Sequence, residues 1–207
     1  MKIIFGTTNK RKVEDLQNLI NILNLNVELI CLDDISWNLG EILENGKTLE
    51  ENSLIKAMAI HKFCQNNNIN LPIITDDSGL FCDGLNGEPG IYTARYADDE
   101  IHTNPKLPKY QCVIKLLRNL EGNENRYAIY RCVVTYMLSD GCFFQEKGES
   151  FGKIAHDIIG NLQKPYFYSV FILNEYNRAF SELKNNELLD TYRYVAFKKI
   201  LKKVNLN

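Results

Sequence analysis

Apolar and polar residues follow two recognisable periods along this chain. Short apolar runs at residues 2–6, 27–32 and 71–75 predict three strands. Between them, apolar residues recur three or four positions apart, which predicts helices that begin at Lys10 and at Thr48. Strands that alternate with helices typically form a sheet with helices packed on its faces. The first third of the chain therefore predicts an α/β fold.

The second half of the chain has longer strand-like segments. Residues 126–138 and 142–154 are two long strand candidates joined by Ser-Asp-Gly, and this turn predicts a hairpin. We expect a helix at residues 104–119, another strand at 166–173, and a closing amphipathic helix with a basic end at 187–204. Because a hairpin is antiparallel, the whole pattern predicts a mixed sheet with flanking helices.

Length and composition narrow the class of protein. At 207 residues, with 45% hydrophobic and 24% charged residues, the chain is typical of a soluble globular protein and suits a single domain, residues 1–207. A net charge of −2 lacks the basic footprint of a general nucleic-acid binder. No apolar run approaches the roughly 20 residues of a membrane span. We therefore expect neither nucleic acid nor a membrane as a partner.

Six cysteines lie singly along the chain, without the paired spacing of a zinc site. Their even number is compatible with disulfides, but Met1 leads directly into a strand-like segment rather than a signal peptide. We therefore expect reduced thiols and a cytoplasmic location.

The first candidate for chemistry is Phe-Gly-Thr-Thr-Asn-Lys-Arg-Lys, residues 5–12. Small polar residues join a strand to a helix start, where unpaired backbone N–H groups and the helix dipole favour an anion. Lys12 falls near the first helical turn and can reach a phosphate bound there. An ordinary N-cap by Thr8 or Asn9 before a solvated basic turn explains the same segment. The glycine pattern of a P-loop is missing.

The helix predicted from Thr48 carries the second candidate. Thr48 and Glu51 have the spacing of a capping box, which marks the start of this helix. Asn52 and Lys56 are four residues apart and therefore lie on one face. Either this polar pair is the solvated side of the helix, or it contributes to a binding site.

The third candidate is the acidic pair Asp76 and Asp77, which ends an apolar run. Adjacent side chains on an extended segment point to opposite sides, so the two carboxylates are expected to have separate roles. One can bind Mg²⁺, and the other can hold Ser78 or a lysine or activate a water. Asp-Asp-Ser-Gly is also ordinary turn chemistry, but α/β sheets bind ligands at the carboxyl ends of their strands. With Lys12 and Lys56, the pair predicts a site for Mg²⁺-bound polyphosphate.

These segments occur together in one family. The sequence resembles the inosine triphosphate pyrophosphatase family, the non-canonical purine nucleoside triphosphate pyrophosphatases, at residues 7–12, 44–57, 76–80 and 85–97, in the family's order and approximate spacing. The resemblance implies an elongated mixed sheet, two lobes around a central cleft, and usually a homodimer. It implies Mg²⁺-dependent hydrolysis of ITP, dITP or XTP to the monophosphate and pyrophosphate, a house-cleaning reaction of nucleotide metabolism.

The resemblance also assigns roles to single residues. It implies that Lys12 and Lys56 neutralise the triphosphate and that Asp77 activates the water, which makes these three the expected catalytic residues. The implied metal ligands are Asp76, Asp77 and Glu44, with Glu41 as the alternative to Glu44 because the alignment slips by about a residue. The implied substrate-binding residues are Thr7, Thr8, Asn9, Lys12, Asn52, Lys56, Ser78, Tyr168, Tyr192 and Arg193.

The C-terminal half departs from the family pattern. Where the family places Phe-Gly-aromatic-Asp-Pro against the base, this chain has Pro-Tyr-Phe-Tyr-Ser-Val-Phe at residues 165–171, with Tyr168 matching the aromatic. Where the family reads the purine edge with Ser-His-Arg, this chain has Thr-Tyr-Arg at 191–193 and lacks the preceding lysine. Buried polar contacts carry much of a pocket's discrimination, so the preferred base is left open.

Two further functions stay open beside the leading one. A diverged paralogue that hydrolyses a different or modified-base triphosphate is favoured by the altered pocket segments. A non-catalytic nucleotide-binding protein is disfavoured, because such a protein has no need of a water-activating carboxylate at Asp77.

Overall fold

The computed structural model of this protein describes residues 1–32, 40, 42–108, 110–160, 162 and 166–204. The chain divides into two compact units. Unit 1 contains residues 1–77, 132–148 and 189–207, and unit 2 contains residues 78–131 and 149–188.

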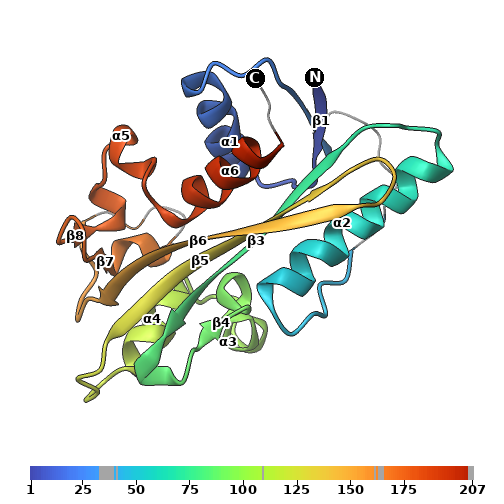
Figure 1. Cartoon of the computed structure of the whole chain (residues 1–207). Helices are drawn as coiled ribbons and strands as arrows, with labels where there is room; N and C mark the ends of the chain where they lie inside the picture. Colours follow the sequence, from blue (N-terminus) through green and yellow to red (C-terminus); the bar gives the residue numbers. More distant parts are fainter. Residues whose placement is uncertain (33–39, 41, 109, 161, 163–165, 205–207) are drawn as a thin grey trace. The chain divides into compact units, whose positions relative to one another are not determined.

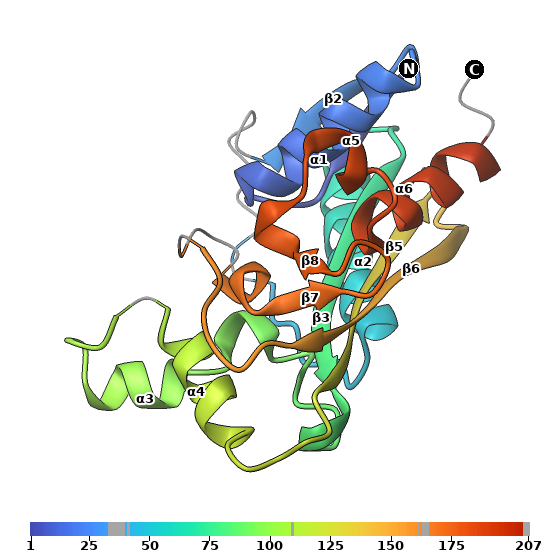
Figure 2. The same ribbon diagram turned by 90° about the vertical axis from the view of Figure 1, so that its left-hand side faces the viewer.

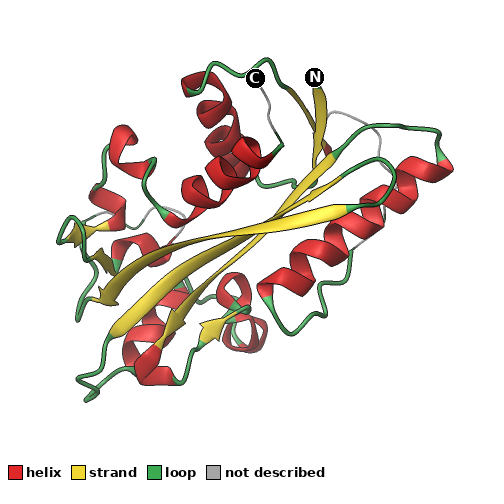
Figure 3. Cartoon of the chain, viewed as in Figure 1, coloured by secondary structure: helices red, strands yellow, loops and turns green. Residues whose placement is uncertain are grey.

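An eight-stranded sheet runs through the chain in the order β2-β1-β3-β5-β6-β7-β8, with β4 paired to β3 (Figures 1 and 3). The strands are β1 (Lys2–Phe5), β2 (Glu28–Cys31), β3 (Ile73–Cys82), β4 (Pro89–Gly90), β5 (Tyr127–Met137), β6 (Phe143–Ile154), β7 (Phe171–Leu173) and β8 (Arg178–Ala179). Strand β1 runs parallel to β2 and β3. In unit 2, β7 and β8 form an antiparallel pair (Figure 2). The predicted mixed sheet is therefore confirmed.

The described helices are α1 (Lys10–Ile22), α2 (Leu49–Asn66) and α6 (Tyr192–Lys203) in unit 1, and α3 (Asp98–Thr103), α4 (Gln111–Asn119) and α5 (Asn185–Leu188) in unit 2. Successive side chains of β1 place α2 and α6 on opposite faces, because alternate residues of a strand point to opposite sides. Ile4 packs in the cluster that contains Ala57 of α2, whereas the Phe5 ring meets the edge of Phe197 in α6. None of the described helices is long and apolar enough to cross a membrane.

The starts of α1 and α2 are fixed by side-chain caps. The Asn9 side chain accepts a hydrogen bond from the Arg11 N–H, so Asn9 rather than Thr8 caps α1. Thr48 caps α2 as predicted, since its hydroxyl accepts from the Glu51 N–H at 3.1 Å. The Glu51 carboxylate accepts from the Lys47 N–H, one residue before the expected position. The capping box is therefore only half formed.

Two prolines shorten the helix that was predicted at residues 104–119. The predicted helix at 104–119 begins only at Gln111. Pro105 and Pro108 lack a backbone donor and disfavour helical geometry in the residues before them, so the chain turns there. A short helix, α3, forms just before this turn instead.

Two further predicted elements are interrupted. In the predicted strand at 166–173, residues Tyr166–Ser169 form a 3₁₀ turn, in which the Ser169 hydroxyl donates to the Tyr166 carbonyl at 2.6 Å. Only Phe171–Leu173 is a strand. The predicted closing helix at 187–204 is also broken, because α6 starts only after its N-cap Thr191. The backbone of Thr191 is extended, with φ −88° and ψ 162°, and this separates α6 from the residues before it.

No disulfide joins the six cysteines, all of which lie in the described part of the chain. This agrees with the expectation of reduced thiols. Burial raises the pKa of the Cys64 and Cys82 thiols, and it raises the pKa of Cys112 to about 11. These thiols therefore behave as small packing groups.

Gly148 lets β6 approach the first turns of α6 within unit 1. A Cβ at this position would lie 1.9 Å from the Tyr192 carbonyl oxygen and 2.6 Å from the Ala196 nitrogen. We expect Gly148→Ala to lower the free energy of unfolding by about 2–3 kcal/mol, because the helix must move away. Thermal unfolding followed by circular dichroism measures this. Gly122→Ala is the control: a Cβ there meets nothing within 4 Å, and its positive φ costs only about 1 kcal/mol. Equal losses would contradict the packing argument.

Candidate active site in unit 1

The acidic pair occupies the last part of β3 that belongs to unit 1. Asp76 is buried, and its Oδ2 lies 3.0 Å from Lys12 Nζ and 3.8 Å from Arg193 Nε. Asp77 is half-buried, and its Oδ1 lies 3.6 Å from Lys56 Nζ. The two carboxylates therefore face different cations, as alternation along an extended strand predicts.

Lys56 joins two carboxylates from separate segments of unit 1. Its Nζ lies 2.7 Å from Glu44 Oε2, in the loop before α2, as well as near Asp77 on β3. The side chain of Lys56 is only 12% exposed. The solvated-face interpretation of this helix face is therefore wrong, and the ammonium is part of a buried cluster.

Asn52 is buried beside this cluster and has a structural partner. Its Oδ1 accepts a hydrogen bond from the Gly46 N–H at 2.9 Å. This contact ties the start of α2 to the loop that also carries Glu44. In this structure Asn52 therefore positions the loop. The alternative ligand Glu41 lies outside the described residues.

Opposite electrostatic surroundings separate the two aspartates. Burial acts to raise the pKa of the Asp76 carboxyl, but Lys12 and then Arg193 hold it below its ordinary value. Burial also raises the pKa of Asp77; Lys56 and Lys12 oppose this, and nearby carboxylates add to it, so the pKa stays above its ordinary value. Two adjacent carboxyl groups whose pKa values are shifted in opposite directions suit different chemical roles. Asp76 remains ionised, and Asp77 is the better proton acceptor.

The same cluster keeps Lys56 charged. Burial acts to lower the pKa of its ammonium, but Asp77, Asp76 and Glu44 together raise it above the ordinary value. A lysine that stays charged can form charge-assisted hydrogen bonds with phosphate oxygens.

The predicted phosphate loop is the exposed turn between β1 and α1. The Thr7 hydroxyl accepts from the Asn9 N–H at 3.1 Å, and Thr8 is exposed. The side chains of Thr7 and Asn9 therefore shape the turn and cap the helix. Lys12 follows within the first helical turn and reaches Asp76.

The remaining predicted substrate residues lie in different surroundings. Tyr192 is buried in unit 1, with the Arg193 guanidinium 5.3 Å from its ring centre. Tyr168 belongs to unit 2, where its ring stacks on Phe180 with 3.9 Å between centroids. Ser78 is half-buried in unit 2, directly after Asp77 in the sequence.

Asp15 is a member of the cluster that the motifs do not include. Its Oδ2 lies 2.9 Å from Arg193 Nη1, and its Oδ1 accepts from the Tyr194 hydroxyl at 3.3 Å. It follows Lys12 by three residues on α1, a spacing that puts both side chains on one face. The spacing from Lys12 could have suggested Asp15 from the sequence. Nothing in the sequence indicates its partner Arg193, which lies 178 residues away.

The oxygen donors near the acidic pair are of the kind that a magnesium ion uses. Within the described residues, no three carboxylate, imidazole or thiol groups converge on one point as a complete metal site. Oxygen donors are nevertheless present at Glu44, Asp76 and Asp77, and Asp76 Oδ1 is buried and accepts no hydrogen bond from any described residue. Mg²⁺ usually takes one or two protein carboxylates and completes its shell with waters and substrate phosphates.

A buried hydroxyl cluster lies behind the acidic pair in unit 1. Ser53 Oγ is 2.7 Å from Thr135 Oγ1 and 3.3 Å from Thr75 Oγ1, and Gln145 Nε2 donates to Thr135 Oγ1 at 2.9 Å. Thr75 directly precedes Asp76. The cluster thus links α2 to strands β3, β5 and β6 next to the site.

We expect Thr135→Val to lower the free energy of unfolding by about 1–2 kcal/mol, because the buried Ser53 hydroxyl and the half-buried Gln145 amide lose a shared partner. Denaturant unfolding measures this. Thr103→Val is the matched control, since the Thr103 hydroxyl donates to the backbone carbonyl of Asp99 at an exposed position. This substitution is expected to change the free energy of unfolding by no more than about 0.5 kcal/mol. Indistinguishable variants would show that the cluster adds nothing to stability.

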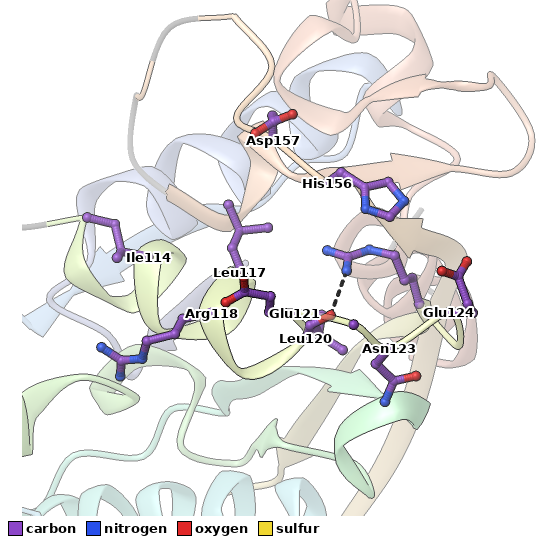
Figure 4. Close-up of a pocket in the computed structure, with 11 residues that line it drawn as sticks. Ile114, Leu117, Arg118, Leu120, Glu121, Asn123, Glu124, His156 and Asp157 are labelled. Carbon is purple, nitrogen blue, oxygen red and sulfur yellow. Dashed lines mark hydrogen bonds between the residues drawn. The ribbon is translucent and has the colours of Figure 1, made fainter.

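A separate pocket of about 540 Å³ lies in unit 2 (Figure 4). Its wall includes Arg118, Glu121 and His156. The guanidinium of Arg126 donates to the carbonyls of Leu120, Ile154 and Ala155, so this cation holds the backbone. The lining contains none of the predicted site residues that the structure describes. We assign it no function.

Comparisons with known proteins match most of this chain to one family. The model of the Ham1 family matches residues 3–203. The dITP/XTP pyrophosphatase of Borrelia recurrentis is 33% identical over 204 residues, covering 97% of this chain and 95% of the relative. The dITP/XTP pyrophosphatase of Clostridium perfringens is 32% identical, covering 90% and 88%.

Solved structures give the same result. A Ham1 protein from Coxiella burnetii is similar with a TM-score of 0.81 and 25% identity, covering 99% of this chain and 98% of that chain. The Staphylococcus aureus Ham1 protein has a TM-score of 0.77 and 26% identity, covering 99% and 97%. These matches confirm the resemblance to the inosine triphosphate pyrophosphatases, and the chain belongs to the Ham1 family.

Proposed function

We propose that this protein is a nucleoside triphosphate pyrophosphohydrolase that converts non-canonical purine nucleoside triphosphates, such as ITP, dITP and XTP, to the monophosphate and pyrophosphate. Relatives about 33% identical over nearly the whole chain bear the name dITP/XTP pyrophosphatase, which supports this substrate class. The observation that carries the proposal is the buried cluster in unit 1, in which Lys12 and Lys56 face the divided pair Asp76 and Asp77.

The lysines bind and neutralise the triphosphate. Lys12 extends from the first turn of α1, where the helix dipole favours phosphate oxygens, and Lys56 extends from α2. Both now contact carboxylates and can exchange these partners for phosphate oxygens. Their charges stabilise the negative charge that develops on the leaving pyrophosphate.

Asp77 acts as the base. The oxygen of a water bonds to the α-phosphorus, the α–β phosphoric anhydride bond breaks, and pyrophosphate leaves with the bridging oxygen. The Asp77 carboxylate takes up the proton of that water. A raised pKa makes Asp77 a better acceptor than an ordinary aspartate. Asp76 remains ionised and holds Lys12 in place.

Mg²⁺ is the proposed cofactor. Glu44, Asp76 and Asp77 would hold it, and it would supply positive charge at the phosphate oxygens. The oxygen-only donor set and the buried Oδ1 of Asp76 support this assignment.

The organisation of the molecule is proposed from the family resemblance. We propose that both units act together as one domain, residues 1–207, in a cytoplasmic homodimer with a house-cleaning role. The net charge of −2 supports a small anionic substrate held by local cations rather than nucleic acid.

One observation favours a second candidate, a paralogue specific for another or a modified base. Ser169 stands where the family pattern has an aspartate, and its buried hydroxyl donates to the Tyr166 carbonyl. This position therefore offers a base no carboxylate, and purine selectivity must come from other groups.

Product analysis tests the proposed reaction. The unmodified protein is incubated with dITP or XTP, and the products are separated by ion-exchange chromatography. We expect equal amounts of monophosphate and pyrophosphate, loss of turnover with EDTA, and recovery with excess Mg²⁺. Nucleoside diphosphate and orthophosphate as products would indicate a different hydrolase. Nucleotide that binds without turnover would indicate a non-catalytic binding protein.

A further inference from the structure

Ser53 and Thr75 connect α2 to β3 within unit 1. The Thr75 hydroxyl donates to the Ser53 carbonyl at 2.7 Å, and the Ser53 hydroxyl donates to the Thr75 carbonyl at 3.3 Å. Both residues are fully buried. A helix and a strand therefore exchange hydrogen bonds in both directions through residues that are 22 positions apart in the chain.

Gln145 and Thr135 extend this exchange into a network in which every side-chain proton has an acceptor. Gln145 Nε2 donates one proton to Thr135 Oγ1 and the other to the Glu50 carbonyl, each at 2.9 Å. The Thr135 hydroxyl lies 2.7 Å from Ser53 Oγ and can donate to it. The Ser53 proton is then left for the Thr75 carbonyl. A buried polar network that is fully satisfied in this way rigidly fixes its members.

The two connected residues lie next to charged groups of the proposed site. Lys56 follows Ser53 by three residues on α2, so the two side chains are neighbours on one face of the helix. Asp77 follows Thr75 by two residues on β3, so their side chains point to the same side of the strand. Lys56 Nζ lies 3.6 Å from Asp77 Oδ1. The hydrogen-bonded pair and the ion pair are thus two contacts between the same helix and the same strand.

Hydrogen bonds fix the position of α2 along β3 more sharply than apolar packing does. Ala57 and Ile60 of α2 pack in one cluster with Ile73 of β3, but burial of apolar surface has no preferred direction. A hydrogen bond weakens steeply when its donor and acceptor move out of line. The exchange between Ser53 and Thr75 therefore determines which residues of the helix and the strand face each other.

We infer that Ser53 and Thr75 are positioning residues of the proposed reaction: their hydrogen bonds hold α2 on β3 so that the Lys56 ammonium stays beside Asp77. The inference rests on the proposed function, in which Lys56 stabilises the leaving pyrophosphate and Asp77 takes up a proton. Misplacing such groups by about 1 Å can lower a rate by roughly 100-fold. Both buried hydroxyls act on the reaction only through these two charged groups.

The kinetic experiment compares Thr75→Val, Thr75→Ser and Ser53→Ala with the unmodified protein, each at a temperature where circular dichroism shows it folded. Valine keeps the shape of threonine and lacks its hydroxyl. We expect Thr75→Val to lower kcat for dITP with Mg²⁺ by about 10–100-fold and to change KM by less than about threefold. Ser53→Ala is expected to show the same pattern. Thr75→Ser keeps the hydroxyl and is expected to retain at least about a third of kcat.

Tyr96→Phe is the control for a loss of stability alone. The Tyr96 hydroxyl donates to Glu88 and accepts from Asn119 in unit 2, so this change also deprives two polar groups of a partner. It is expected to leave kcat and KM unchanged. If Thr75→Val keeps kcat within about threefold of the unmodified protein, or Thr75→Ser loses as much as Thr75→Val, the hydrogen bonds serve only stability and the inference is overturned.

A second measurement does not depend on turnover. The Lys56 side chain is only 12% exposed, so acetic anhydride is expected to acetylate it slowly in the folded protein, and mass spectrometry of peptides gives the rate. We expect Thr75→Val and Ser53→Ala to raise this rate at least about threefold, and Tyr96→Phe to leave it unchanged. Unchanged acetylation in both unit 1 variants would contradict the inference.

The two measurements separate the inference from the proposed function. If the unmodified protein hydrolyses no nucleotide, the proposed function fails, and the acetylation of Lys56 still tests whether Ser53 and Thr75 hold it in place. If Thr75→Val does not fold, Ser53→Ala gives the same comparison in both measurements.

Discussion

Asp77→Asn is expected to lower kcat for pyrophosphate release by about 10³-fold while nucleotide affinity stays within a few-fold. Asparagine keeps the shape of the side chain but cannot accept the proton of the attacking water. Asp77 is the carboxylate whose pKa is raised, and it lies beside Lys56. Coupled detection of pyrophosphate with dITP and Mg²⁺ gives the rate, and calorimetry with a non-hydrolysable analogue gives the affinity.

Asp99→Asn is the matched control for this change. Asp99 forms an ion pair with Lys115 in unit 2, and its side chain is 69% exposed, so its neutralisation is expected to leave kcat unchanged. Retention of more than a third of the activity by Asp77→Asn would place the water-activating base elsewhere.

The neighbouring change, Asp76→Asn, is expected to lower the stability of the fold. We expect a loss of about 3 kcal/mol, because removing one partner of a buried charge cluster leaves the others uncompensated. Asp76 is 1% exposed and faces both Lys12 and Arg193. For a chain of this length, the loss corresponds to a fall in melting temperature of about 6–12 °C.

Asp77→Asn provides the internal comparison for stability. The pKa of Asp77 is raised, so folding favours its neutral form, and neutralisation is expected to leave the melting temperature unchanged or higher. Asp99→Asn removes an exposed ion pair with Lys115, which water screens, and is expected to leave the melting temperature nearly unchanged. Equal melting temperatures for the Asp76 and Asp77 variants would contradict the division of the pair.

The elements that the sequence predicted correctly are those with an uninterrupted period. The stripe from Lys10 gave α1, the run before Asp76 gave the start of β3, and the hairpin of β5 and β6 followed from Ser-Asp-Gly. The failures came where single residues override the period. Pro105 and Pro108 delay α4, and the extended backbone of Thr191 interrupts the last predicted helix. Patterns of polarity do not register such local backbone restrictions.

The sequence predicted which residues belong to the candidate site but not which of them contact one another. Lys12, Lys56 and the aspartates follow from their motifs, since each motif places a charge at the end of a strand or on one helix face. Whether Asn52 binds substrate or a backbone N–H depends on the fold of the loop before α2. The contact of Asp15 with Arg193 joins two helices from opposite ends of the chain. Only the tertiary structure brings such groups together.

The most direct test of the proposed function is the release of pyrophosphate by the unmodified protein from dITP and XTP, compared with dGTP and dATP, in excess Mg²⁺. We predict release from dITP and XTP with kcat/KM at least about tenfold above the canonical nucleotides, because even a few contacts to the base edge provide this much discrimination. If the protein releases pyrophosphate from neither dITP nor XTP, the proposed function is contradicted.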